Sequence, residues 1–409
     1  MINMKRRSDF IPFARPYFTT EEEQAVAEVL RSGWVSTGKA AEELERAFTR
    51  KLQCYFASAV NSATAGLHLA VKALGISEND VVITTPFTFT ATAEILRYEN
   101  AHPLFVDIDE ESFNIDAEQV ERTLLERRHG GASGVKAIIP VHIAGRLCDM
   151  EALLKLREQF GVPLIEDAAH SFPVKSSLGW AGTLGDAGIF SFYATKPITT
   201  GEGGMFVSNR EDLARTVNTL RLHGIDRSVW DRYNSKTSSW EYDVVAPGYK
   251  YNLSDVLAAI GVVQMKKADL FLARRREIAR KYLDGLRGED YLVLPDTGEA
   301  AGIDRDPGKS HAWHLFILRI KPEMLTIDRD SYMHLLSEDN IGVSLHFRPL
   351  HLMTYYRKTY GLKPEDFPVA LSVYQSCFSI PLYYGLTDGE VEYIIAKIRE
   401  IGRKYRKNR

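Results

Sequence analysis

The sequence contains few cysteines and no strong excess of charge of either sign. Its three cysteines, Cys54, Cys148 and Cys377, lie far apart in 409 residues and form no CxxC pair. This spacing argues against a cysteine-based metal site and a disulfide framework, and it is typical of a protein of the reducing cytoplasm. The formal net charge is −3, so the overall charge does not favour nucleic-acid binding.

Long apolar runs are also absent. No stretch reaches the length of a membrane span, and residues 1–16 carry charge but lack the apolar centre of a signal peptide. We find no internal repeat and no low-complexity segment. We therefore expect a soluble cytoplasmic protein that binds neither membranes nor nucleic acids.

Histidines in the last third of the chain raise the question of a metal site. They are His311, His314, His346 and His351. The first two are three residues apart on an apparent strand, which would place their side chains on opposite faces. No acid or cysteine joins them at ligand spacing, so we expect no metal.

The pattern that is present is an alternation of strands and helices. Apolar, often β-branched strands are expected at residues 81–85, 103–107, 137–141, 162–165 and 189–192. This predicts an α/β fold with a mostly parallel sheet buried on both faces. A loop rich in Gly, Asp and Pro at 287–309 predicts a boundary. We expect a large domain at 1–286 that ends in a long helix. A smaller α/β domain at 287–409 would include strands at 312–320 and 341–347.

Four residues follow strands or open helices within the larger domain. Thr64 lies in a run of small residues at a helix start, Phe89 at a strand–helix junction, and Asp167 and Lys196 at strand ends. Each has a plain structural alternative, respectively a helix cap, core packing, an N-cap and an exposed lysine. Because ligands bind beyond the carboxyl ends of strands in such sheets, we expect these four residues to lie together.

Their order matches what pyridoxal 5'-phosphate requires. The phosphate binds a helix N-terminus, and the ring needs a flat apolar neighbour. The pyridine nitrogen needs a carboxylate, and the aldehyde needs a lysine amine.

With these residues the chain resembles the DegT/StrS-type sugar aminotransferases, a branch of the fold-type-I (aspartate aminotransferase-like) pyridoxal phosphate enzymes. The resemblance covers about residues 8–405. It rests on the ordered stretches SGWVSTG, NSATAGLHLA, VITTPFTFTATA, PLFVDID, IIPVHIAG, IEDAAHS, FSFYATKPITTGEGG, GYKYNLSD and SLHFRPLH. The chain is similar in particular to C4-aminating enzymes such as UDP-4-amino-4-deoxy-L-arabinose–oxoglutarate aminotransferase.

The resemblance implies a seven-stranded sheet, a bound pyridoxal phosphate and a homodimer with shared active sites. It implies that Lys196 forms the Schiff base and moves protons, that Asp167 pairs with the pyridine nitrogen, and that His170 lies near the phenolic oxygen. Further cofactor contacts are implied for Thr64, Ala65 and Ser191 at the phosphate, Phe89 at the ring, and Asn252 from the partner subunit. Candidate substrate residues are Tyr193, Arg348, His346 and Trp34.

The implied reaction is ping-pong transfer of an amino group from L-glutamate to a keto group of a nucleotide-linked sugar. It would proceed through pyridoxamine phosphate, release 2-oxoglutarate and serve polysaccharide or lipopolysaccharide synthesis. We expect amination at C4. The alternatives are a C3-aminotransferase, a sugar dehydratase or a non-catalytic cofactor-binding sensor. Tyr193 and Pro197 stand where close relatives often have His and Asn, so the sugar stays open. The loops at 226–246 and 341–352 are expected to shape its pocket.

Overall fold

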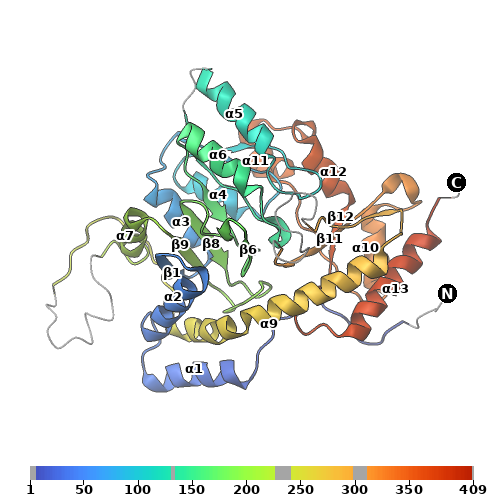
Figure 1. Ribbon diagram of the computed structural model, residues 1–409, viewed down its shortest axis with the longest axis horizontal. Coiled ribbons are helices and arrows are strands. Elements are labelled where there is room, and N and C mark those ends of the chain that lie inside the picture. The colour runs from blue at the N-terminus through green and yellow to red at the C-terminus, as the bar shows by residue number, and fades with distance from the viewer. Residues whose placement is uncertain (1–5, 130–133, 226–240, 298–310, 408–409) are drawn as a thin grey trace.

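The computed structural model describes residues 6–129, 134–225, 241–297 and 311–407. Residues 226–240 of the expected specificity loop lie outside this part. Figure 1 shows the long helix α9 (Asp255–Leu286) running from α1 (Thr20–Ser32) and α2 (Lys39–Leu52) to α10 (Arg329–Glu338) and α13 (Asp388–Lys404). Helix α9 packs against α1, α2 and α13, so it connects both ends of the molecule.

A central sheet confirms the predicted parallel architecture. Its first four strands in spatial order are β1 (Phe56–Val60), β9 (Gly204–Ser208), β8 (Ala187–Ser191) and β5 (Ile165–Asp167). Three more follow as β4 (Val135–Ile138), β2 (Val81–Thr84) and β3 (His102–Phe105). Parallel bridges Ile138–Leu164 and Val141–Asp167 join the two groups. Among these strands β9 alone runs antiparallel to its neighbours.

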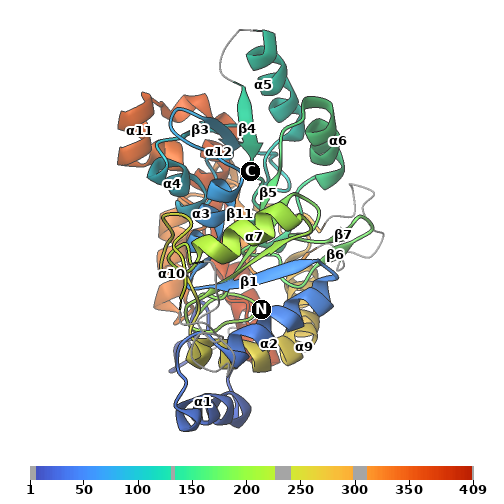
Figure 2. The ribbon, with the colours of Figure 1, turned by 90° about the vertical axis from the view of Figure 1, so that its left-hand side faces the viewer.

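Helices cover both faces of this sheet. The core on one face includes α3 (Ala63–Ala73), α4 (Ala91–Tyr98) and α7 (Glu211–Leu220). The cores on the other face include α2, α5 (Ala117–His129), α6 (Met150–Phe160) and α9. Along β9 the side chains alternate accordingly, because Phe206 packs with α3 while Met205 and Val207 pack with α2. Figure 2 shows the sheet between these helices.

The last part of the chain forms a smaller antiparallel sheet with its own helices. The strands are β10 (Leu292–Val293), β11 (Phe316–Ile320) and β12 (Cys377–Ile380). The helices are α10, α11 (Thr354–Tyr360), α12 (Pro368–Ser376) and α13. Its core also contains Ile11 and the C-terminal residues of α9, including Tyr282. The division after residue 286 stays a prediction, and we call residues 287–409 the second lobe.

Short elements complete the described chain. They are the hairpin β6 (Lys175–Ser176) and β7 (Gly179–Trp180), and 3-10 turns at Ile143–Gly145, Pro322–Met324, Leu350–Leu352 and Pro364–Asp366. Over the part of the chain that the structure describes, no helix is long and apolar enough to cross a bilayer.

One predicted strand is absent and two are displaced, and one of the displaced strands was expected at 162–165 but lies at Ile165–Asp167. Residues 341–347 form no strand, because Ile341 pairs with Ile11 whereas Ser344 pairs with Ser379, so no continuous ladder forms. The expected strand at 312–320 begins only at Phe316. Before it, Trp313 has φ +49°, a left-handed conformation that an extended strand does not allow.

Candidate active site

The sequence-predicted residues converge on a cavity of about 500 Å³ beyond the carboxyl ends of β5 and β8. A cavity of this size is typical of small-molecule sites. Second-lobe residues His314, Leu345 and Phe347 form its opposite wall. The predicted residues that line the cavity are Thr64, Phe89, Asp167, His170, Ser191, Tyr193, Lys196 and His346.

The N-terminus of α3 forms one end of the cavity. The Ser62 side chain accepts a hydrogen bond from the Ala65 amide at 3.1 Å, which fixes the first turn. Strand β9 approaches this turn at Gly204, where a Cβ atom would lie 2.7 Å from the Ala63 nitrogen. The first amides of a helix have no carbonyl partner four residues back, so they suit an anion such as a phosphate.

Asp167 provides a buried carboxylate at the end of β5. Its oxygens accept hydrogen bonds from Thr92 Oγ1 at 2.8 Å and from the Ala169 amide at 3.2 Å. Thr92 Oγ1 also pairs with Thr88 Oγ1 at 2.8 Å. Burial raises the pKa of the Asp167 carboxyl, and these hydrogen bonds act in the opposite direction. A cationic ring nitrogen in the cavity would therefore pair with a pre-oriented carboxylate.

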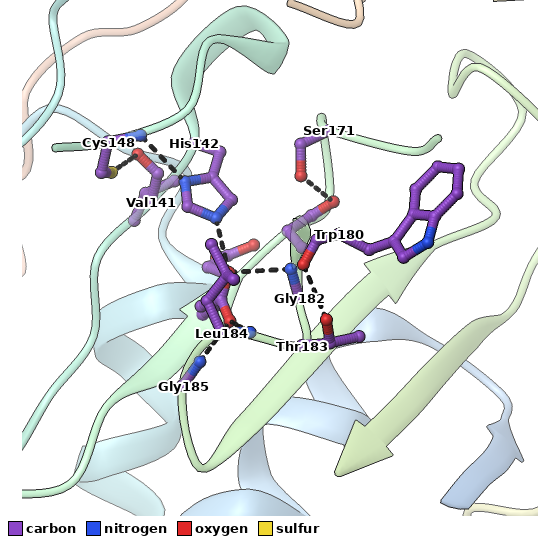
Figure 3. Close-up of polar contacts among 12 residues, drawn as sticks. Val141, His142, Cys148, Ser171, Trp180, Gly182, Thr183, Leu184 and Gly185 are labelled. Atoms are coloured by element: carbon purple, nitrogen blue, oxygen red, sulfur yellow. Dashed lines mark hydrogen bonds and ion pairs between the residues drawn. The ribbon is translucent and has the colours of Figure 1, made fainter. Parts of the chain in front are cut away.

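A second buried carboxylate, that of Glu166, fixes the end of β5 through its hydrogen bonds. It accepts His142 Nε2 at 3.0 Å and the amides of Gly182, Leu184 and Gly185 at 2.8, 2.7 and 2.6 Å. Figure 3 shows His142, Gly182, Leu184 and Gly185, with these hydrogen bonds as dashed lines. Because both oxygens are satisfied, the loop after β7 and the end of β4 are tied to the strand that carries Asp167.

Lys196 lies where β8 breaks into a turn, and its amide donates to the Tyr193 carbonyl at 2.9 Å. Burial lowers the pKa of the Lys196 amine to about 8, while Asp167 acts to raise it. A fraction of the amine is therefore neutral near physiological pH. The neutral amine is the nucleophilic form.

His170 is buried and contacts two rings of the second lobe. Its ring centroid lies 4.4 Å from that of His314 and 5.9 Å from that of Phe347, with the Phe347 plane inclined by only 16°. The Nδ1 atom of His170 is buried, and no residue in the described part of the chain forms a hydrogen bond with it. Burial and the nearby Lys196 hold the pKa of His170 well below its usual value, so the ring is uncharged.

Four of the predicted residues do not line this cavity. The Ala65 amide is bonded to Ser62, and Arg348 is exposed and donates to the Leu352 carbonyl at 3.2 Å. The Trp34 Nε1 atom donates to the Thr37 carbonyl at 3.0 Å, and the Asn252 amide donates to Thr37 Oγ1 at 2.6 Å. The last two therefore belong to a separate cluster.

Sequence reasoning missed the residues that support the predicted ones. Thr92 lies in the first turn of α4 and Thr88 in the loop before it, so their contact depends on how that loop folds. His314 and Phe347 could not be recognised either, because only packing of the second lobe brings them to His170.

The residues present fit pyridoxal phosphate. A helix N-terminus, a buried carboxylate and an amine of lowered pKa surround one cavity. The uncharged ring of His170 lines the same cavity and adds a polar group beside these three.

Comparisons with known proteins agree with this chemistry. A model of the DegT/DnrJ/EryC1/StrS aminotransferase family matches residues 16–399. The spore coat polysaccharide biosynthesis protein SpsC of Bacillus subtilis is 40% identical over 97% of this chain and 98% of its own length.

Solved structures show the same similarity. The putative sugar aminotransferase Spr1654 from Streptococcus pneumoniae in its PMP-form has a TM-score of 0.85 at 30% identity, covering 96% of this chain and 99% of its own. A PLP-form of that protein is also similar. Helicobacter pylori PseC, an aminotransferase involved in pseudoaminic acid biosynthesis, has a TM-score of 0.85 at 25% identity, covering 97% and 100%.

Proposed function

Because the chain belongs to the DegT/DnrJ/EryC1/StrS aminotransferase family, and is a pyridoxal-phosphate-dependent sugar aminotransferase, we propose that L-glutamate is its donor and a nucleotide-linked keto-sugar its acceptor. The observation that carries the proposal is that Lys196 and Asp167 line the same cavity. Amination at C4 is proposed on the resemblance to C4-aminating enzymes, and C3 is the alternative.

When bound, pyridoxal phosphate supplies an aldehyde that takes up the amino group and a ring that withdraws electrons from the reacting carbon. Lys196 would hold the cofactor through its aldehyde carbon, and the amino group of the donor would displace Lys196 Nζ and leave it as a free amine. This amine would carry the proton from the α-carbon of the donor to the cofactor, and in the second half from the cofactor to the carbon of the acceptor. Asp167, oriented by Thr92 and the Ala169 amide, would hold a cationic ring nitrogen.

The wall opposite Lys196 supports a sugar as the acceptor. Burial and the nearby Lys196 lower the pKa of His346 to about 4, and the pKa of His314 also lies well below its usual value. These imidazoles are therefore uncharged hydrogen-bonding groups. Beside them Phe89, Tyr193 and Phe347 add aromatic surface. Uncharged polar groups next to aromatic rings suit the hydroxyls and the apolar face of a sugar ring.

A homodimer with shared sites completes the proposal. Trp34 and Asn252 both bind Thr37 and lie outside the cavity of their own chain. Since the resemblance assigns Asn252 to the cofactor phosphate, the partner's cavity is the place where this cluster would act.

The test is an absorbance titration of the purified protein loaded with pyridoxal phosphate. We expect L-glutamate to remove the visible band and to release one 2-oxoglutarate per site. A 4-keto nucleotide sugar should then restore the band, and NMR of the product should locate the new amine. Restoration by a 3-keto sugar alone would assign amination to C3. If glutamate leaves the band unchanged, the donor assignment is wrong, and loss of water from the sugar would identify a dehydratase.

A further inference from the structure

His314 is placed at the cavity by a buried clamp. Arg275 of α9 is 4% exposed, and its Nη1 atom donates to the carbonyls of Trp313, His314 and Leu382 at 3.2, 3.3 and 2.7 Å. A buried guanidinium shared among three carbonyls fixes the backbone of this segment. The clamp therefore sets where the His314 side chain enters the cavity.

His314 and His170, which are far apart in the sequence, form a pair of imidazoles that line the cavity. They are 5% and 6% exposed, and their centroids are 4.4 Å apart at an interplanar angle of 49°. In both rings Nδ1 is buried, and the described residues offer it no hydrogen-bond partner. Because both residues line the cavity and Nδ1 is buried, Nε2 is the ring nitrogen left to face the cavity.

Two cationic side chains, Lys196 and Arg275, act on His314. Burial lowers the pKa of His314 most, and His170, Lys196, Arg275 and His346 act in the same direction. The carboxylate of Asp167 lines the same cavity. An uncharged imidazole can offer a hydrogen bond there without adding a further charge. The ring also packs against His170, which is itself stacked on Phe347.

We propose that His314 is a positioning residue of the reaction. It holds the ring of His170 against Phe347, and it presents its own Nε2 to the bound cofactor or substrate. This inference rests on the proposed cofactor site. It means that a residue of the second lobe orients His170, which belongs to the larger part of the chain before it.

Three variants separate this role from a general structural one. His314→Phe keeps a ring beside His170 but removes both nitrogens, and His314→Gln keeps a polar group near the Nε2 position but removes the ring. His311→Phe is the matched control. His311 is also buried and lies three residues earlier, but its ring stacks on Trp313 at 4.0 Å and does not line the cavity.

The measurements are the Kd of pyridoxal phosphate by equilibrium dialysis, the pH midpoint of the visible band, and the Tm of the apoprotein. We expect His314→Phe to weaken cofactor binding about tenfold and to shift the pH midpoint, with the Tm within about 2 °C of the wild type. His314→Gln should weaken binding less. His311→Phe should change only the Tm, because its Nδ1 accepts the Trp313 amide.

An unchanged Kd and midpoint in His314→Phe, or equal changes in His311→Phe, would overturn the inference. A wild-type protein without a visible band would instead refute the proposed cofactor site. In that case ¹⁵N-histidine NMR of the apoprotein still tests whether the rings of His314 and His170 are in contact. The ring signals of His170 must move in His314→Phe and stay in place in His311→Phe, and the reverse result refutes it.

Discussion

Two groups of motif segments meet at two different places in the same chain. The segments that contain Thr64, Phe89, Asp167 and Lys196 line one cavity. The segments 32–38 and 252–255 bind each other instead. Asp255 accepts the amides of Gly38, Ala40 and Ala41 at 2.7, 3.1 and 3.0 Å. We call these two segments the outer cluster.

The comparison teaches that order along the chain does not reveal which site a motif serves. Segments in the first group follow strands whose carboxyl ends share one sheet edge, so topology brings them together. The outer cluster forms through a helix cap, in which Asp255 satisfies amides at the start of α2. The outer cluster can contact the cofactor, as we propose for Asn252, only in the cavity of a second subunit.

The largest effect is expected from breaking the first group at Lys196. Lys196→Ala removes both the nucleophile and the proton carrier, so we expect transamination to fall by at least about 10³-fold and the glutamate-sensitive band to disappear. Lys155→Ala is the control, since this exposed lysine only pairs with Glu151 at 2.9 Å. Wild-type turnover in Lys196→Ala would refute the assignment.

The next prediction tests whether the outer cluster serves the other subunit. Asn252→Ala should weaken cofactor binding about tenfold or more. If Lys196→Ala and Asn252→Ala chains are mixed to form hybrid dimers, one site receives both lesions and the other receives none. We expect about a quarter of the wild-type activity to return. Activity no greater than the mean of the two separate variants would place Asn252 with its own cavity or outside catalysis.

A smaller effect concerns the stability of the apoprotein. The pKa of Lys196 is lowered to about 8 from 10.5. Well below pH 8 the amine is protonated in both the folded and the unfolded state, and the folded protein is destabilised by a buried charge. Between about pH 8 and 10.5 the folded protein loses this proton while the unfolded chain keeps it, so stability rises with pH.

Lys196→Met should therefore be more stable than the wild type at pH 7, by roughly 1–3 kcal/mol, and this gap should shrink as the pH rises through that window. Urea unfolding at several pH values measures it. For Lys155→Met, the difference in stability from the wild type should not shrink in this pH window. If the difference for Lys196→Met stays constant with pH, the lowered pKa of Lys196 is contradicted.

The smallest effect is expected from loosening the outer cluster. Asp255→Asn keeps the size of the side chain but removes its charge, so the cap on α2 should lose about 1 kcal/mol of unfolding free energy. The visible band of the loaded enzyme should keep its pH midpoint, because Asp255 does not line the cavity. A shifted midpoint would show that the two groups of segments are coupled within one chain.

Much of the cofactor site could be predicted from the sequence. Asp167 and Lys196 follow apolar strands, and the run Ser62–Thr64 opens an apolar helix. These are local patterns, and parallel topology turns them into a common site. The prediction of a strand at 341–347 was wrong because it used local composition alone. These residues have the composition of a strand, but they pair with two different partners.

The sequence by itself determined the alternation of strands and helices, the identity of the lysine and the carboxylate, and the family to which the chain is similar. Only the tertiary structure decided that His314 faces His170, that Glu166 fixes the end of β5, and that Trp34 and Asn252 lie outside the cavity. The physical reason is that these outcomes depend on contacts between residues far apart in the chain. Such contacts are set by how helices and lobes pack, and no local pattern encodes them.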